Sequence, residues 1–301
     1  MQQQDLLNDE QIAQFASRHR LPDTFSGATH QKFLRLAAWI SAKSHPGETL
    51  IVAISGAQGA GKSTLADFLQ LALETGAGLR VAALSLDDFY LTKAERAQLG
   101  AAVHPLLVTR GVPGTHDLRM LSACLRQLRM LAAGQSLRLP RFDKAEDDRA
   151  GPADWAAVSG PVDAVVLEGW CLGIEAQAEE ALAQPVNSLE YEADASGEWR
   201  RFVNDQLAGP YAELFAQLDL LVFLKVPNID AAYRWRREQE RKLAGESSVR
   251  RAGIMSEAQV ARFVQHFERV TRAGLASLPL KADAVLELND QHDGVRLEIR
   301  E

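Results

Sequence analysis

The sequence predicts a three-layer α/β/α fold, in which helices cover both faces of a mostly parallel, five-stranded sheet. Short apolar runs, typical of strands buried on both faces, alternate along the chain with segments of helical periodicity. The first apolar run, residues 50–54, leads directly into a glycine-rich loop and then into an amphipathic helix. Strands that alternate with helices in this way form parallel sheets, because each helix carries the chain back to the end where the previous strand began.

Residues 1–48 are predicted to form a helical N-terminal extension that packs on the core. Apolar side chains recur there at helical spacing, and the pattern is interrupted at Leu21-Pro22, where the proline should break the helix. Residues 49–301 are predicted to form one domain, because neither repeats nor a low-complexity stretch divide them.

The other elements are predicted from the same two patterns. The five parallel strands are expected at residues 49–55, 80–86, 162–167, 218–226 and 284–288. A short strand is expected near residues 137–142, and the alternation in 295–299 indicates an antiparallel edge. Helices are expected at about residues 62–74, 117–131, 198–217, 228–243 and 256–276, the second of them capped by Asp117. Residues 184–197 and 244–253 are expected to be mobile.

The composition of the 301 residues is that of an ordinary globular protein and argues against several classes. The net charge of −7 disfavours nucleic-acid binding, which requires a basic face. No apolar stretch reaches the roughly 18 residues of a membrane-spanning helix, and the first residues lack the pattern of a secretion signal. Cys124 and Cys171 lie far apart without metal-ligand spacing. We therefore expect a cytoplasmic protein without nucleic-acid or membrane partners, whose oligomeric state the sequence does not indicate.

A complete phosphate-binding motif, Gly-Ala-Gln-Gly-Ala-Gly-Lys-Ser, occupies residues 56–63. Its glycines allow backbone N–H groups to curl around a polyphosphate at a helix N-terminus. Lys62 would reach the β- and γ-phosphates, and Ser63 would place its hydroxyl on Mg²⁺. The motif therefore predicts a nucleoside triphosphate and Mg²⁺ as cofactors. The expected nucleotide-binding residues are Gly56, Gln58, Gly59, Ala60, Gly61, Lys62, Ser63 and Thr64.

Two carboxylates, Asp87 and Asp88, follow the second predicted strand. Ligands of parallel sheets bind beyond the carboxyl ends of the strands, so an Asp here would face the γ-phosphate. It could then accept the proton of an attacking hydroxyl. Adjacent residues point in opposite directions, so only one of the pair is expected to look into the site. The alternative is a pair of solvated carboxylates in a turn.

Glu168 ends the third predicted strand, residues 162–167, where a carboxylate can hold Mg²⁺ directly or through water. The alternative role is a cap for the following segment.

Residues 234–242 form the most strongly basic helix of this acidic chain. A mobile helix that brings Arg236 or Arg237 over the triphosphate would stabilise the transferring group, which predicts a helical lid at about residues 228–253. The alternative is a solvated face tied by the pairs Arg236–Glu240 and Glu238–Lys242.

Two polar loops, residues 111–117 and 140–144, could bind the acceptor. Arg141 would clamp a small anion with two hydrogen bonds, and Lys144 would add a point charge. The alternative is that both loops simply carry surface charges.

Together these motifs resemble the D-glycerate 3-kinase family, which lies in the wider clan of phosphoribulokinase, uridine kinase and pantothenate kinase. Besides the phosphate loop, the resemblance rests on residues 85–92, 114–118, 140–144 and 168–173, in this order. It spans about residues 49–245. It implies a P-loop kinase that transfers the γ-phosphate of ATP to a small hydroxyl compound, with D-glycerate as the leading acceptor. It also implies that Asp87 is the base and that the basic helix is a lid.

The resemblance completes the list of candidate site residues. The catalytic candidates are Asp87, Lys62, Arg236 and Arg237. The candidates for acceptor binding are Asp87, Asp88, Tyr90, His116, Asp117, Arg141, Asp143 and Lys144. The candidates for Mg²⁺ binding are Ser63, Glu168 and Asp87.

Two alternatives remain open. The acceptor could be a nucleoside, pantothenate or another sugar acid, and Tyr90, Phe142 and Trp170 could stack on a nucleoside. The chain could instead be a nucleotide-hydrolysing switch or assembly factor, a class less favoured here. It lacks the Asn-Lys-x-Asp motif of GTPases and the Leu-Ser-Gly-Gly-Gln motif of ABC ATPases.

Overall fold

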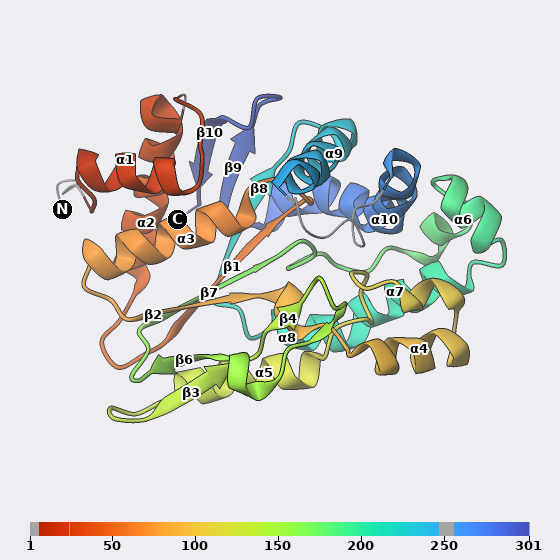
Figure 1. Cartoon of the computed structure of the whole chain (residues 1–301), viewed down its shortest axis with the longest axis horizontal. Coiled ribbons are helices and arrows are strands. Elements are labelled where there is room, and N and C mark those ends of the chain that lie inside the picture. Colours follow the sequence, from red (N-terminus) through yellow and green to blue (C-terminus); the bar gives the residue numbers. More distant parts are fainter. Residues whose placement is uncertain (1–5, 24, 247–255, 301) are drawn as a thin grey trace.

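The computed structural model describes residues 6–23, 25–246 and 256–300 and is built around a six-stranded sheet (Figure 1). The strand order is β10-β9-β8-β1-β7-β2, and five strands run parallel. The strands are β1 (Leu50–Gly56), β2 (Val81–Ser85), β7 (Ala164–Gly169), β8 (Leu220–Lys225), β9 (Ala284–Leu288) and β10 (Gly294–Ile299). β10 pairs antiparallel with β9, so it is the antiparallel edge that alternation predicted. The mostly parallel α/β/α fold is confirmed.

Helices cover both faces of the sheet because the first five residues of β1, Leu50 to Ile54, are all apolar. Its residues Val52 and Ile54 point to one face, and Ile51 and Ala53 point to the other. The first face is covered by α1 (Asp9–Arg18), α2 (His30–Lys43), α3 (Lys62–Thr75) and the start of α9 (Ile229–Glu246). The second face is covered by α5 (Leu118–Arg129), α7 (Glu198–Gln206), α8 (Ala212–Phe215) and α10 (Glu257–Lys281).

Side-chain caps determine where several helices begin. Asp117 caps α5 as the sequence predicts, and its carboxylate accepts a hydrogen bond from the Met120 N–H at 3.0 Å. A helix without a sequence prediction, α4 (Lys93–Ala102), begins with a reciprocal capping box between Thr92 and Glu95. Its apolar periodicity is weak, so the capping box was the signal that could have revealed it.

The short strand predicted near residues 137–142 is divided at Pro140-Arg141. β3 (Ser136–Leu139) pairs with β6 (Ala156–Ser159), and β4 (Phe142–Asp143) pairs with β5 (Asp148–Arg149). These two small antiparallel sheets lie outside the main sheet, next to β2 (Figure 1). No helix in the described part of the chain has the length and apolarity needed to cross a membrane.

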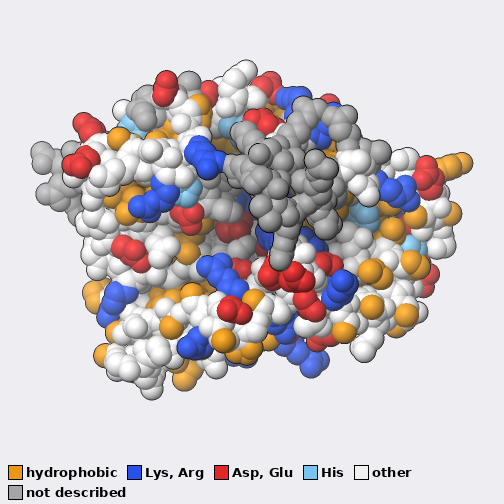
Figure 2. Space-filling model, viewed as in Figure 1, with side chains coloured by type: hydrophobic (Ala, Val, Ile, Leu, Met, Phe, Trp, Pro, Cys, Tyr) orange, Lys and Arg blue, Asp and Glu red, His pale blue; other side chains and the backbone are white. Residues whose placement is uncertain are grey.

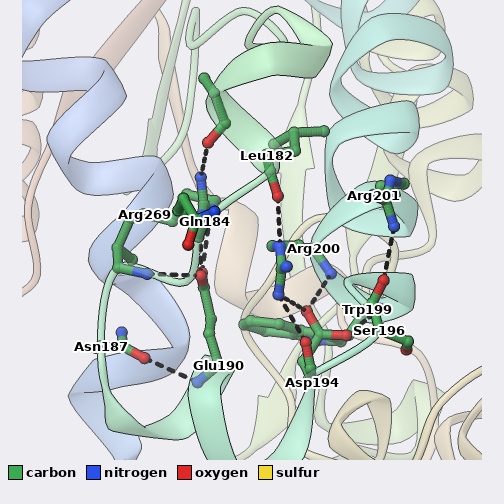
Figure 3. A network of polar contacts seen from close by, with 12 residues as sticks. Leu182, Gln184, Asn187, Glu190, Asp194, Ser196, Trp199, Arg200, Arg201 and Arg269 are labelled. Atoms are coloured by element: carbon green, nitrogen blue, oxygen red, sulfur yellow. Dashed lines mark hydrogen bonds and ion pairs between the residues drawn. The ribbon is translucent and has the colours of Figure 1, made fainter.

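Residues 184–197, expected from composition to be a mobile loop, contain the short helix α6 (Ser188–Ala193) and two buried carboxylates (Figure 3). Glu190 receives two hydrogen bonds from the guanidinium of Arg269 in α10, at 2.8 and 2.7 Å. Asp194 pairs with Arg200 at 3.1 Å, and Arg200 also donates to the Leu182 carbonyl. Long-range ion pairs of this kind leave no local sequence pattern, which explains the difference.

Replacing Arg269 with Ala is expected to lower the free energy of unfolding by about 3–5 kcal/mol, because the buried Glu190 carboxylate would lose its bidentate partner. Urea denaturation measures this change. The matched control is Arg262→Ala on the same helix, since Arg262 and its partner Glu192 are both at least half exposed. The control should cost less than about 1 kcal/mol. Equal losses in the two variants would contradict a stabilising role of the buried pair.

Candidate active site

The phosphate loop connects β1 to α3 and has the backbone that anion binding requires. Gly59 and Gly61 have φ angles of +77° and +86°, a region that favours glycine. Gly61 is the N-cap of α3, and no side chain accepts a hydrogen bond from the first turn. The N–H groups of this turn are therefore available to phosphate oxygens, and the helix dipole favours negative charge there.

The ammonium of Lys62 lies between this loop and two carboxylates. Its Nζ donates a hydrogen bond to the Ala57 carbonyl at 3.0 Å. Burial lowers the pKa of Lys62, whereas the nearby Glu168 and Asp87 carboxylates counteract part of that change. The positive charge is thus held within the site, where the terminal phosphates of a nucleotide would meet it.

Glu168 is positioned by the register of three neighbouring strands. It is the second-last residue of β7, opposite Ile54 of β1 and Ser85 of β2, and the Ser85 hydroxyl donates a hydrogen bond to its carboxylate. Burial raises the pKa of Glu168, and Lys62 and Ser85 oppose this rise. Sequence reasoning missed Ser85, although its place two residues before Asp87 was a signal.

Asp87 lies in a 3₁₀ turn, Leu86–Phe89, directly after β2. One carboxylate oxygen accepts from the Tyr90 hydroxyl at 2.7 Å, and the other accepts from Lys144 Nζ at 2.7 Å. Burial alone would raise the pKa of Asp87, but the Lys144 ammonium and the Tyr90 hydroxyl outweigh it and lower the pKa to about 2. Asp87 is therefore ionised at neutral pH and can accept a proton.

Asp88 has a different environment from its neighbour. One oxygen accepts from the Phe142 N–H at 3.1 Å, and the other pairs with Arg141 at 3.0 Å. Burial raises the pKa of Asp88 above its ordinary value, and its two partners oppose that rise. These contacts tie the 3₁₀ turn to the loop between β3 and β4, so Asp88 positions the loop that carries Arg141 and Lys144.

Two cavities meet at Asp87. One, of about 460 Å³, follows the phosphate loop and α9, and the other, of about 550 Å³, lies between α3, β2 and the β3–β6 sheet. The lining residues common to both are Ser63, Asp87, Lys144 and Glu168. Asp88 lines only the second cavity. In Figure 2, acidic and basic side chains gather around the hollowed centre of this face. The arrangement can hold a nucleotide on one side of Asp87 and a hydroxyl compound on the other.

The oxygen ligands in this region suit Mg²⁺. Ser63, Asp87 and Glu168 line the smaller cavity together. No group of three or more His, Cys, Asp or Glu side chains in the described residues could hold a metal ion by itself. Such a site fits Mg²⁺, which is usually bound by one or two carboxylates together with substrate phosphates and water.

The two arginines predicted for the lid differ in whether they line a cavity. Arg236 lines the 460 Å³ cavity, and its guanidinium lies 5.4 Å from the centre of the Phe263 ring. Arg237 is exposed and lines neither cavity. The side chains of residues 239–246, and residues 247–253 altogether, lie outside the described part. The predicted pairs of Arg236 and Glu238, and the end of the lid, therefore stay predictions.

His116, Asp117 and Asp143 lie outside both cavities. His116 is buried, its ring stacks on Tyr90 at 4.6 Å, and burial lowers its pKa to about 4. Asp117 caps α5 and pairs with Arg149 at 3.1 Å. The Asp143 carboxylate accepts from two backbone N–H groups of its own turn. Acceptor binding by these three residues stays a prediction.

Sequence reasoning also missed three residues that line the 460 Å³ cavity: His19, Trp235 and His292. The Trp235 and His292 rings stack at 3.6 Å, and His292 Nε2 lies 2.9 Å from the Gly59 carbonyl oxygen. They come from the C-cap of α1, from α9 and from the turn after β9. Only the chain fold brings them to the phosphate loop, so no local sequence signal marks them.

A strand–loop–helix phosphate site, with a carboxylate at the junction between its cavity and a second one, defines a P-loop phosphotransferase. The comparisons with known proteins agree. The chain is 34% identical over 229 residues to "Uncharacterized kinase mug58" of Schizosaccharomyces pombe, which covers 73% of this chain and 79% of that protein. The chain therefore belongs to the D-glycerate 3-kinase-like family of P-loop kinases. It is a phosphotransferase with an alcohol group as acceptor.

Two further relatives support this membership. The chloroplastic D-glycerate 3-kinase of Arabidopsis thaliana is 30% identical over 238 residues, which cover 76% of this chain and 48% of the plant protein. The chain thus spans about half the length of that relative. The solved structure of D-glycerate 3-kinase from Cryptococcus neoformans has a TM-score of 0.71 and 26% identity, and covers 89% of this chain and 97% of that one. No family model matches the chain.

Proposed function

We propose that this kinase transfers the γ-phosphate of ATP to D-glycerate and forms 3-phosphoglycerate. The observation that carries the proposal is the position of Asp87 where the nucleotide cavity meets a second cavity, with Lys144 and Arg141 beside it. Glycerate is a small anion with hydroxyl groups, so it needs a base for a hydroxyl and cations for its carboxylate. The names of two relatives, both D-glycerate 3-kinases, point to the same acceptor.

The proposed mechanism depends mainly on positioning and charge. The phosphate loop and Lys62 hold the triphosphate, while Ser63 and Glu168 hold Mg²⁺. Mg²⁺ held there would supply positive charge to stabilise the negative charge of the phosphates. Asp87 orients the acceptor hydroxyl and accepts its proton as the oxygen attacks the γ-phosphorus. Arg236 covers the phosphates and stabilises charge on the transferring group.

The acceptor carboxylate would change the partners of two exposed cations. Lys144 and Arg141 are 62% and 57% exposed, and ion pairs of exposed side chains exchange at little energetic cost. A bound carboxylate offers both cations a new partner. We infer that Lys144 then leaves Asp87, whose oxygen becomes accessible to the acceptor hydroxyl.

We also propose that residues 1–48 are an extension on a kinase domain that comprises residues 49–301, and that α9 acts as a lid that excludes water. The rest of the predicted lid, residues 247–253, lies outside the described residues. A cytoplasmic location accords with free, buried Cys124 and Cys171.

The ring contacts favour a sugar acid over a nucleoside as acceptor. The face of Tyr90 is stacked on His116, and Phe142 meets Tyr90 edge to face at 5.2 Å. Trp170 is buried and donates its indole N–H to the Gly111 carbonyl at 2.8 Å. These rings already pack against the protein, which leaves less of their surface for a nucleobase.

Turnover with a panel of acceptors tests the proposal. Mg·ATP is supplied with D-glycerate, L-glycerate, pantothenate or uridine, or without acceptor, and ADP and phosphorylated product are measured. Among these acceptors, we expect rapid ADP formation only with D-glycerate. Without an acceptor, ATP hydrolysis should be very slow. Preference for another compound would overturn the acceptor assignment, and acceptor-independent hydrolysis would favour a switch.

Replacing Arg141 with Ala is expected to raise the KM for D-glycerate by about 10-fold or more, because a charge-assisted hydrogen bond to the acceptor is lost. The KM for ATP should stay within about twofold, since Arg141 lines only the second cavity. Steady-state kinetics with each substrate varied in turn measures both values.

The matched control is Arg138→Ala. Arg138 lies three residues earlier, and its guanidinium donates to backbone carbonyls of residues 152–155 outside both cavities. This variant should leave both KM values unchanged. Equal increases in the two KM values for Arg141→Ala would refute a contact with the acceptor carboxylate.

A further inference from the structure

A third cavity, of about 660 Å³, lies beside the phosphate loop and is walled partly by the N-terminal segment. His19, Leu21 and Pro22 of this segment line it. Trp235 of α9 and the turn of residues 290–293 line it too. The cavity reaches Gly59–Gly61 and Thr64 of the phosphate loop, so it is continuous with the 460 Å³ cavity that contains Asp87.

The two cavities offer space for the two ends of a nucleotide. A nucleotide whose phosphates lie on the loop must direct its terminal phosphate toward Asp87, so its nucleoside extends the other way. The 660 Å³ cavity starts from the same loop residues, and its size is typical of small-molecule sites. Leu21, Phe25 and Leu224 give it apolar surface, and Trp235 adds an aromatic ring. These side chains suit a planar base.

The N-terminal segment is fixed relative to the phosphate loop by contacts at both of its ends. The His19 ring stacks on Phe15 at 4.2 Å, and its Nε2 lies 3.8 Å from a carboxylate oxygen of Asp67 in α3. At the other end, Thr29 Oγ1 accepts a hydrogen bond from the Gly294 N–H of β10 at 3.1 Å. Since α3 carries the phosphate loop at its N-terminus, the segment and the loop are held together.

We propose that residues 19–22 are part of the nucleotide site and, together with Trp235, contact the base and ribose of ATP. The N-terminal extension is then a specificity-determining part of the enzyme as well as a cover for the core. This inference rests on nucleotide binding at the phosphate loop, and it is independent of which hydroxyl compound accepts the phosphate.

Calorimetric binding of two probes tests the inference. ADP carries a nucleoside, whereas inorganic tripolyphosphate occupies only the phosphate loop. The variants His19→Ala and Leu21→Ala are expected to weaken ADP binding by about 5- to 20-fold, because each removes contact surface for the nucleoside. Tripolyphosphate should bind to the variants and to the unaltered protein within about twofold. The exposed Gln14→Ala on α1 is the control and should change neither affinity.

The probes distinguish a contact from a general structural effect. Unchanged ADP binding in both variants would overturn the proposal, and so would equal weakening of ADP and tripolyphosphate, which indicates a displaced loop. Thermal unfolding identifies a variant that fails to fold, and the conservative His19→Gln then replaces His19→Ala. The expected result would stand even if D-glycerate proved not to be the acceptor, because neither probe involves the acceptor.

Discussion

Replacing Asp87 with Asn is expected to reduce phosphoryl transfer by on the order of 10²-fold or more, while the KM for ATP changes little. The amide keeps the size of the side chain and can still accept from Tyr90, but it cannot take a proton from the attacking hydroxyl. The hydroxyl must then attack while it still carries its proton. Single-turnover kinetics with saturating Mg·ATP and D-glycerate measures the chemical step.

The neighbouring Asp88→Asn is the matched control for this variant. Asp88 is bonded to the Phe142 N–H and Arg141 rather than placed between the cavities, so its loss should affect acceptor KM more than kcat. A loss of kcat in Asp88→Asn, with normal kcat in Asp87→Asn, would show that the base is the other carboxylate.

Removing the ammonium of Lys62 by Lys62→Ala is expected to lower kcat/KM for ATP by on the order of 10³-fold, with the fold retained. Lys62 supplies the one positive charge on the phosphate loop itself, and it is half-buried, so its charge interactions are stronger than in bulk water. Turnover and ADP binding measure the loss, and circular dichroism verifies the fold.

Lys43→Ala, at the exposed end of α2, controls for a simple change of net charge and should behave like the unaltered enzyme. If Lys62→Ala kept normal turnover, the phosphate loop could not be the nucleotide site.

The local patterns of the sequence predict much of this fold. The apolar runs of β1 and β7 and the glycine motif between β1 and α3 are short-range signals, and the structure has these elements within two residues of the expected bounds. α4 was overlooked because an alanine-rich helix has little apolar periodicity, so only its cap marks it. α6 was overlooked because buried ion pairs with residues far along the chain hold it in place.

For the candidate site, the sequence predicts residues on the strand ends but not their mutual orientation. Alternation predicted that only one of Asp87 and Asp88 looks into the site, but both lie in a 3₁₀ turn and line the 550 Å³ cavity. Asp87 differs from Asp88 in that it also lines the 460 Å³ cavity. His19 and His292 lie far from the phosphate loop in sequence, and they reach it only through the packing of α1 and the turn after β9.

The role of Asp87 is tested most directly by a crystal structure with Mg²⁺, a non-hydrolysable ATP analogue and D-glycerate bound together. We expect a glycerate hydroxyl within about 2.6–3.2 Å of the Asp87 carboxylate and in line with the γ-phosphorus, with Lys144 on the glycerate carboxylate. A structure in which Asp87 stays paired with Lys144 and the acceptor hydroxyl lies against a different group would contradict it.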